Sequence, residues 1–574
     1  MIDETHSAER STLDRRRFLL AAVGGAGALA LAGCKGSKSS AGSAGSAGSA
    51  PQGAAPRATM RLADGALGFP SPFASNGGPG YQQMSLVYDT LLWQDGSGTL
   101  LPWLAKSFKV SDDHLTYTFE LRDGVKWSDG QPFTADDVAF TFDYYATQKQ
   151  LSPPVIIQPP QGIAKVTPKG ATTVEFTLDK PKVTFAAQVA GAVPIIPKHV
   201  WASIHDPAGA LDVKVLVGTG PYKVESYNDD GNPILFTARD DYFLGAPFVK
   251  RIEMNAITDQ FPALLSGGSD IARGFGVRDD VLAPFKGNGE FGMITDVGNF
   301  VTAQLYWNLG KGGALADVKF RQACAMAIDR KNLLTRFAAG RGAPGNPGFL
   351  GPENPWFTAV RQYDFDVAGA NALLDGAGYR LGNGGIRQGP DGKPLSFEFR
   401  YDNVDAVPLS EIVIPALRKI GVELRGKPAT IGPDLFGPKL FGGFDMAVLP
   451  YPGPAPGGPN ADPDVLRVMF SSKVAAYSLT AASGYANSAF ETLADKQLVT
   501  FDEGQRRTIT DQMQHIIADD IPVLPLYFPE SDWVFRKRVF DQWYFTPGEF
   551  PTSENNKQLF VTGMKAGTKI RASK

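Results

Sequence analysis

Cysteine and histidine are scarce in this chain, and several common catalytic motifs are missing. Among 574 residues there are two cysteines and five histidines. After residue 34, no two histidines stand at helical ligand spacing or beside a cysteine, so we expect no metal site. The patterns HExxH, GxxxxGKS/T and GxSxG do not occur. We therefore expect no metal, no cofactor and no catalytic residue, and hence no enzyme.

The chain also lacks a strong net charge. Its formal net charge is -3 at pH 7, which argues against nucleic acid as a partner. Adjacent carboxylates occur at Asp136–Asp137 and Asp519–Asp520, but neighbours on a helix point away from each other. We interpret both pairs as helix-end or solvated charges. The first pair follows Thr134 and precedes an apolar run, which predicts a capped helix start.

The apolar segment near the N-terminus is too short for a permanent membrane span. It runs from Phe18 to Gly33 and consists mainly of Ala and Gly, whereas a helix needs about 20 apolar residues to cross a bilayer. The preceding letters RRRFL, which begin with Arg15 and Arg16, resemble a twin-arginine pattern, and LAGC, ending in Cys34, resembles a lipobox. Residues 1–33 are thus interpreted as a twin-arginine lipoprotein signal. A dinucleotide-binding loop and a disordered basic tail are the weaker alternatives.

The lipobox implies that Cys34 becomes the first mature residue and carries lipid. The protein would then be exported and lipid-anchored to the outer face of the cytoplasmic membrane. Residues 34–56 are rich in Gly, Ser and Ala and predict a flexible tether with a reach of about 25 to 30 Å.

With Cys34 lipidated, Cys324 has no disulfide partner. Because it lies in the apolar-periodic segment FRQACAMAIDR, we expect a buried structural thiol.

The sequence pattern of the body, from about residue 57 onward, predicts an α/β protein with more than one lobe. It is long enough for two or three domain-sized cores. LTYTFEL and TTVEFTL alternate as strands, whereas TADDVAFTFDYYATQ and DVAGANALLDGAGY have the pattern of helices. The stretch from LSFEFRYD to ALRKIGVELRG reads strand, helix, strand, which is the unit that builds a mixed sheet.

Six segments of the body together resemble one known family. They are GTLLPWLAKSFKVSDDHLTYTFELRDGVKWSDGQPFTADDVAFTF, PIIPKHVW, GTGPYKVESY, FRQACAMAIDR, AGANALLDGAGY and DIPVLPLY. Their order is that of the family 5 extracytoplasmic solute-binding proteins, the peptide- and nickel-type binding components of ABC importers. The resemblance implies a two-lobed periplasmic-binding-protein-like fold of the class II, cluster C type, with an extra subdomain in lobe one. Such lobes close around a ligand.

The resemblance also implies boundaries and partners. Lobe one would comprise residues 57–94 and 184–296, the extra subdomain 95–183, lobe two 297–530, and residues 531–574 would return to lobe one. The hinge strands would lie near TAQLYWNLG and PLYFPESDW. The expected partners are a small-molecule or peptide ligand, an ABC permease with its ATPase, and the membrane through the lipid anchor. The protein is expected to be a monomer.

Ligand-binding residues follow from the same resemblance. In peptide-binding relatives an extended peptide pairs with a backbone edge, and NGGPGYQQ resembles that edge here, which makes Asn76 and Tyr81 candidates. Trp307 and Asn308 follow the first hinge strand, and Tyr527 lies at the second. Aromatic faces suit sugar rings and apolar side chains alike, so Trp307 and Tyr527 do not indicate a ligand class.

The matching segment of lobe two departs from the family pattern. Peptide binders carry an aspartate there that pairs with the peptide's α-amino group, but in FDMAVLPYPGPAPGGPNADPD the position falls on Pro454 or Pro459, depending on the alignment. Neither can form an ion pair. Tyr451 and Asp462 remain ligand candidates in this segment, although Asp462 is better placed to cap the helix that begins near Val465.

Three functions stay open from the sequence. The first is an importer receptor for a peptide-class ligand whose α-amino anchor is lost or replaced. The second is the same role for an oligosaccharide, an N-blocked peptide or another uncharged solute, which the missing aspartate favours. The third is a surface enzyme or interaction protein that uses the same body.

Overall fold

The computed structural model describes residues 59–63, 68–74, 82–94, 100–147, 162–228, 233–247, 249–297, 303–352, 354–402, 407–429, 444–449, 462–477 and 483–540. Several predictions fall outside these ranges. They concern the export signal and anchor, with Arg15, Arg16 and Cys34, and the ligand candidates Asn76, Tyr81 and Tyr451. Among the described residues, no helix is long and apolar enough to cross a membrane.

Two separate four-stranded sheets are built from the first half of the chain. One has the strand order β1 (Met60–Leu62), β10 (Arg251–Met254), β9 (Ile234–Ala238) and β8 (Tyr222–Tyr227). The other has the order β4 (Ala105–Val110), β5 (Thr116–Leu121), β7 (Thr173–Leu178) and β6 (Ile163–Pro168). In β5 and β7 every second residue is buried, as the alternating sequence predicts for a sheet with one covered face. Helix α2 (Ala135–Thr147) packs on this sheet, with the rings of Phe142 and Phe176 edge to face.

An eight-stranded sheet carries most of the remaining strands. Its main path is β11 (Ile271–Phe275), β20 (Val523–Arg536), β13 (Ala303–Trp307), β19 (Met446–Leu449), β17 (Ser396–Asp402) and β18 (Glu423–Ala429). Two further strands, β12 (Phe291–Val297) and β14 (Gly342–Pro344), also pair with β20. The predicted strand, helix, strand unit is confirmed, because β17 and β18 are parallel and joined by α9 (Val407–Arg418).

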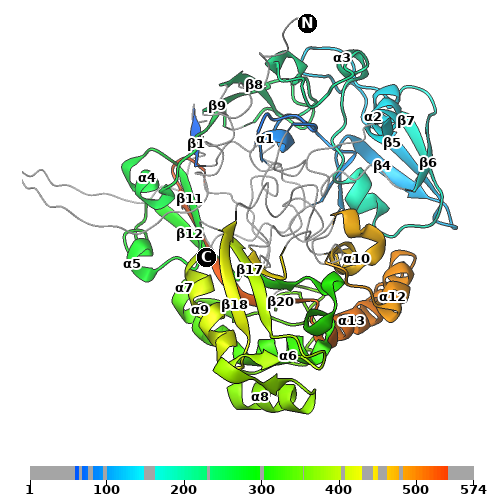
Figure 1. The fold of residues 1–574 in the computed structure, drawn as a ribbon. Coiled ribbons are helices and arrows are strands. Elements are labelled where there is room, and N and C mark those ends of the chain that lie inside the picture. The colour runs from blue at the N-terminus through cyan, green and yellow to red at the C-terminus, as the bar shows by residue number, and fades with distance from the viewer. Residues whose placement is uncertain are drawn as a thin grey trace, which may run out of the picture.

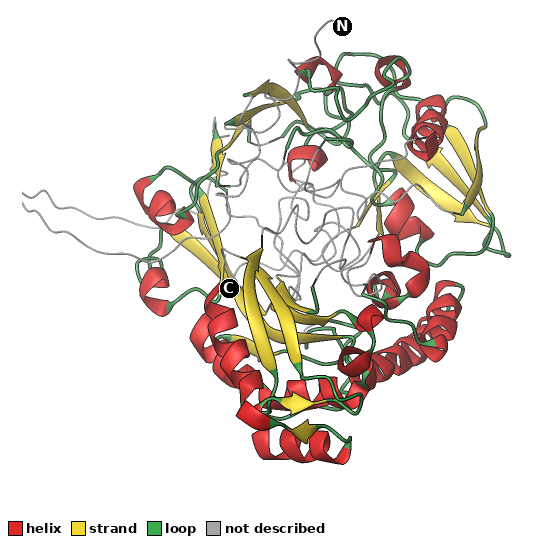
Figure 2. Cartoon of the chain, viewed as in Figure 1, coloured by secondary structure: helices red, strands yellow, loops and turns green. Residues whose placement is uncertain are grey.

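The longer helices belong mainly to the second half of the chain, where they lie around the strands (Figure 2). They are α6 (Val318–Ala327), α7 (Arg330–Phe337), α8 (Val367–Gly376), α10 (Asp464–Phe470), α12 (Ser488–Leu498) and α13 (Glu503–Asp520). Short pieces complete the first half: α1 (Gln82–Ser85), β2 (Leu92–Gln94), β3 (Leu100–Pro102), the π-helix η2 (Phe185–Ala190), α3 (Lys198–Trp201), α4 (Gln260–Ser266) and α5 (Asp279–Leu282).

The charged pairs singled out in the sequence lie at helix ends, as predicted. Asp136 and Asp137 are in the first turn of α2, where Asp137 accepts a hydrogen bond from the Thr134 backbone N–H at 2.9 Å. Asp519 and Asp520 end α13. Asp520 accepts hydrogen bonds from the side chains of Tyr485 and Asn487, so these carboxylates stabilise local structure.

Hydrophobic side chains form two large cores from different stretches of chain. The first core combines residues between Met60 and Ile271 with Trp533, Phe535 and Phe540. The second core lies between Ala303 and Phe528, in two neighbouring clusters. Cys324 on α6 is fully buried in the second core, as predicted, and burial raises the pKa of its thiol. The separation of the cores agrees with a two-lobed α/β fold.

Strand β20 is shared by the two halves of the molecule. Its residues up to Pro529 pair with β13 and β14, whereas those from Glu530 onward pair with β11 and β12. Apart from Glu530, every residue of the strand is buried. Figure 1 shows β20 running from the region of β11 and β12 into the sheet that contains β17 and β18. Strands β13 and β20 occupy the two segments for which hinge strands were predicted.

Candidate functional site

Trp307 and Asn308 lie at the end of β13, inside the second core. The Trp307 side chain is fully buried, and its indole Nε1 has no hydrogen-bond partner within the ranges that the structure describes. Asn308 donates from Nδ2 to the Phe444 carbonyl oxygen at 3.1 Å and from its backbone N–H to that of Asp445 at 2.8 Å. Asn308 therefore fastens the end of β13 to the start of β19.

Tyr527 lies on β20, shortly before the strand changes partners. It faces Ala303 of β13 and Pro344 of β14 in the sheet register. Its ring is parallel to that of Phe337, with centroids 6.3 Å apart and an interplanar angle of 18°. Its exposed fraction is 9%. The structure thus brings Tyr527 and the start of β13 together at the junction of the two halves.

Gln304 is a polar residue of this junction that the sequence reasoning missed. The register between β13 and β20 shifts between Ala303 and Gln304, which marks a β-bulge, and bulges often re-aim side chains next to functional sites. Gln304 is fully buried. Its Oε1 accepts a hydrogen bond from the Tyr306 hydroxyl at 2.8 Å, whereas its Nε2 has no partner in the described part of the chain. In the sequence, this residue could have been found as a single amide side chain within the apolar strand AQLYW.

Asp462 is held by an arginine rather than standing free. Its carboxylate forms a two-pronged ion pair with Arg506, at 2.6 and 2.9 Å. One carboxylate oxygen also accepts the Asp464 backbone N–H at 2.8 Å, at the start of α10. The predicted position at a helix start is therefore correct, and Arg506 is a partner that local sequence did not indicate.

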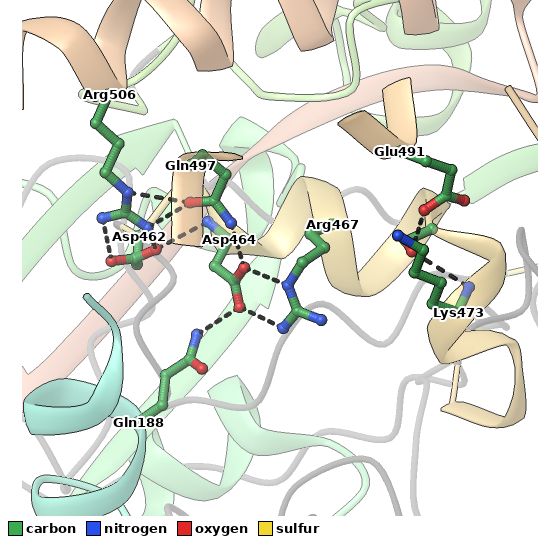
Figure 3. A network of polar contacts seen from close by, with 9 residues as sticks. Gln188, Asp462, Asp464, Arg467, Lys473, Glu491, Gln497 and Arg506 are labelled. Atoms are coloured by element: carbon green, nitrogen blue, oxygen red, sulfur yellow. Dashed lines mark hydrogen bonds and ion pairs between the residues drawn. The ribbon is translucent and has the colours of Figure 1, made fainter. Parts of the chain in front are cut away.

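Asp464 is the centre of a second, fully buried network (Figure 3). Its carboxylate receives two hydrogen bonds from Arg467, at 2.7 and 2.8 Å, and others from Gln497 and, at 3.1 Å, from Gln188. Burial opposes ionisation, but the charge and hydrogen bonds of Arg467 outweigh it and lower the pKa of Asp464 to about 2. Asp464 is therefore a permanently charged acceptor at neutral pH, and the sequence reasoning did not select it.

The described residues contain no group of three or more His, Cys, Asp or Glu side chains that could hold a metal ion. Two of the histidines make other contacts. His199 pairs with Asp129 at 2.7 Å, and the ring of His114 stacks on Phe501. The described part of the site therefore offers hydrogen-bond donors, carboxylates and aromatic rings.

Comparison with known proteins identifies relatives along most of the chain. The family described as bacterial extracellular solute-binding proteins, family 5 Middle, matches residues 99–475. Protein XP55 of Streptomyces lividans is 29% identical over 451 residues, which cover 77% of this chain and 79% of that protein. The nickel-binding periplasmic protein of Escherichia coli (strain K12) is 27% identical over 468 residues, covering 77% and 84%.

Solved structures share the fold. The oligopeptide-binding protein AppA from Bacillus subtilis, in complex with a nonapeptide, has a TM-score of 0.69 and 24% identity and covers 84% of this chain and 95% of its own. NikA from Brucella suis, in complex with Fe(III)-EDTA, has a TM-score of 0.70 and 23% identity, with coverage of 90% and 100%. Relatives and structural neighbours are solute-binding proteins and not enzymes. The chain belongs to the family 5 bacterial extracellular solute-binding proteins, whose two-lobed α/β fold it shares.

Proposed function

We propose that this chain is the solute-binding component of an ABC importer, tethered by lipid to the outer face of the cytoplasmic membrane. It captures a peptide-class ligand between its lobes and delivers it to the permease. Membership of family 5 supports this role, as do relatives that are named for binding oligopeptides and nickel. The single observation that carries the mechanism is β20, which pairs with different strands before and after Pro529.

Lobe closure is the proposed ligand-dependent step. A strand whose two parts pair with different neighbours allows these two groups of strands to rotate about the point where its partners change, while the ladders on either side stay intact. The two hydrophobic cores are built from separate stretches of chain, so each half can move as a unit. A ligand that contacts both halves then favours the closed form by its differential affinity. Only that form would fit the permease.

The ligand-binding residues are proposed to lie along β13 and the junction. Tyr527 is held at the junction by the contacts described above, whereas Trp307 and Asn308 lie at the other end of β13. We add Gln304, because its buried Nε2 is a donor that has no partner among the described residues. A buried donor of this kind favours a ligand that supplies a carbonyl or hydroxyl oxygen. Asn76, Tyr81 and Tyr451 remain candidates outside the described residues.

A second ligand class is favoured by one observation. Asp462 would be the available carboxylate for a free amino terminus, because prolines occupy the two aligned positions. Its two oxygens are already paired with Arg506, and only 15% of its side chain is exposed. Breaking a buried pair to bind an ammonium group is costly. An N-blocked peptide, an oligosaccharide or another uncharged solute is therefore the second candidate.

Native mass spectrometry tests the ligand class directly. The full chain carrying Cys34→Ser would be produced in its own host, purified gently and sprayed without denaturation. A heterogeneous set of added masses that fragment as peptides is the expected result. A single added mass that fragments as a sugar or another non-peptide would overturn the peptide class in favour of the second candidate. Turnover of that compound by the purified chain would overturn the receptor role itself.

A further inference from the structure

Contacts between the two halves gather around α10 and α12, away from the shared strand. Gln188 of η2 donates from Nε2 to Asp464 of α10 at 3.1 Å. The Val183 backbone N–H donates to the Leu498 carbonyl oxygen, at the end of α12, at 2.8 Å. Figure 1 shows α10 and α12 on the side of β4 to β7, with β11 and β12 on the opposite side of the molecule. Rotation about the shared strand would therefore displace these contacts more than contacts close to that strand.

A ring contact belongs to the same interface. His114, in the turn between β4 and β5, has its imidazole 3.6 Å from the ring of Phe501, with an interplanar angle of 8°. Phe501 lies between α12 and α13. Lys182 is half-buried next to Val183, and burial lowers the pKa of its ammonium group in spite of the nearby Asp464. The interface thus contains hydrogen bonds, a stacked pair and a cation.

Residues of its own half orient the Asp464 carboxylate for the contact with Gln188. Arg467 and Gln497 hold its carboxylate whether or not Gln188 is present (Figure 3). The charged acceptor therefore stays oriented and compensated when the halves separate. Opening removes the bond from Gln188 and frees a neutral amide, which water can solvate. Such a contact can be made and broken repeatedly without leaving an unpaired buried charge.

We propose that Gln188 and Asp464 form a latch that holds the two lobes closed, with Val183–Leu498 and His114–Phe501 as flanking contacts. The latch rests on the proposed function, because closure is the step that retains the ligand. A hydrogen bond to a charged group changes an equilibrium by on the order of tenfold or more. A few contacts of this size shift the equilibrium toward the closed form, and a ligand that contacts both halves shifts it further by its differential affinity.

Hydrogen exchange on the full chain with Cys34→Ser tests the latch without any ligand. The Val183 amide is the reporter, because its hydrogen bond crosses between the halves. In Gln188→Ala its exchange should become roughly tenfold faster, since each opening then breaks one charged hydrogen bond fewer. The matched control is Gln322→Ala. Gln322 donates to the Asp519 carbonyl oxygen at 3.0 Å within one half, so its loss should leave the Val183 amide unchanged.

Three outcomes would overturn the latch. They are an unchanged rate at Val183 in Gln188→Ala, an equal acceleration in Gln322→Ala, or an acceleration that extends to the amides of α6, which would indicate general unfolding. The proposed function fails separately. If the mass spectra show no peptide or other solute and Val183 still responds to Gln188→Ala, the receptor role is lost and the latch stands. If a ligand is bound but the exchange rate at Val183 does not change in Gln188→Ala, the receptor role stands and the latch is lost.

Discussion

Arg341 and Asp532 form a two-pronged ion pair where β20 changes partners, with both nitrogen–oxygen distances at 2.6 Å. Asp532 is fully buried and also accepts a hydrogen bond from the Thr295 hydroxyl of β12 at 2.7 Å. Arg341 immediately precedes β14 and also contacts Glu530 at 2.8 Å. The pair therefore ties strands from both halves of the molecule to the shared strand.

Replacing Arg341 by alanine should destabilise the fold strongly. The change leaves the buried Asp532 carboxylate without its cation, and removing one partner of a buried pair costs about 3 to 5 kcal/mol. Urea denaturation of Arg341→Ala would measure the loss. Arg278→Ala is the control, because Arg278 and Asp280 form a pair whose side chains are 66% and 63% exposed. A midpoint in Arg341→Ala no lower than in the control would contradict this role.

Two buried glutamines offer a matched test of the site. Gln514 is fully buried and paired at both ends of its amide, with Trp356 and Thr358, so Gln514→Leu should cost about 2 kcal/mol or more of unfolding free energy. Gln304→Leu should cost less, about 1 kcal/mol, because it removes only the hydrogen bond that Oε1 accepts from the Tyr306 hydroxyl, and Nε2 has no partner to lose among the described residues.

The same pair separates stability from binding. In native mass spectra, Gln304→Leu should retain far less of the bound solute than the unsubstituted chain, whereas Gln514→Leu should retain it while folded. Equal retention in both variants would mean that Gln304 does not face the ligand.

Local sequence predicted elements and burial well, because periodicity reports which face of an element is covered. The helix around Cys324 and the unit of β17, α9 and β18 follow from such patterns. The segments that became β13 and β20 were instead indicated by the family resemblance. The partners of polar groups could not be predicted in the same way. Gln188 and Asp464 are 276 residues apart, and Arg341 and Asp532 are 191 apart. Only the folded arrangement brings them together, so neither the latch nor the ion pair has a local signature.

Cys324 should be unreactive in the native protein. Full burial raises the pKa of its thiol, and the reactive species is the thiolate. In the full chain with Cys34→Ser it is the single remaining cysteine, so a colorimetric thiol reagent reports it alone. The expected result is no labelling in buffer and one equivalent in denaturant. Rapid labelling in buffer would mean that the second core opens readily.

Replacing Cys34 by serine should release the protein from membranes, because the thiol that carries the lipid is removed. Fractionation of the native host would show Cys34→Ser in the soluble exported fraction. Cys324→Ser is the matched control and should stay with the membranes, since that thiol is buried in the second core. Persistence of Cys34→Ser in the membrane fraction would refute the lipid anchor.

Acid should weaken the protein partly through Asp464. Its pKa is about 2 in the folded chain against 3.8 for an ordinary aspartate. Because the folded value is the lower one, the stabilising contribution is complete above about pH 4 and is lost as the pH falls toward 2. A difference of this size corresponds to about 2 kcal/mol. In urea titrations between pH 5 and pH 2.5, Asp464→Asn should therefore lose less unfolding free energy than the unsubstituted chain.

Replacing Arg467 tests whether this residue causes the pH dependence of stability at Asp464. Arg467 contributes the charge that overcomes the effect of burial on Asp464. In Arg467→Met burial is opposed by the smaller effects of Gln188, Gln497 and Lys182, so the pKa of Asp464 should rise above its ordinary value. A group whose folded pKa is raised stabilises the protein below its unfolded pKa and loses that contribution as the pH rises through the folded value. In Arg467→Met, Asp464 should therefore stabilise the fold more at low pH than at neutral pH, which is the opposite of its effect in the unsubstituted chain. Parallel pH profiles for Arg467→Met and the unsubstituted chain would show that Arg467 does not control this carboxylate.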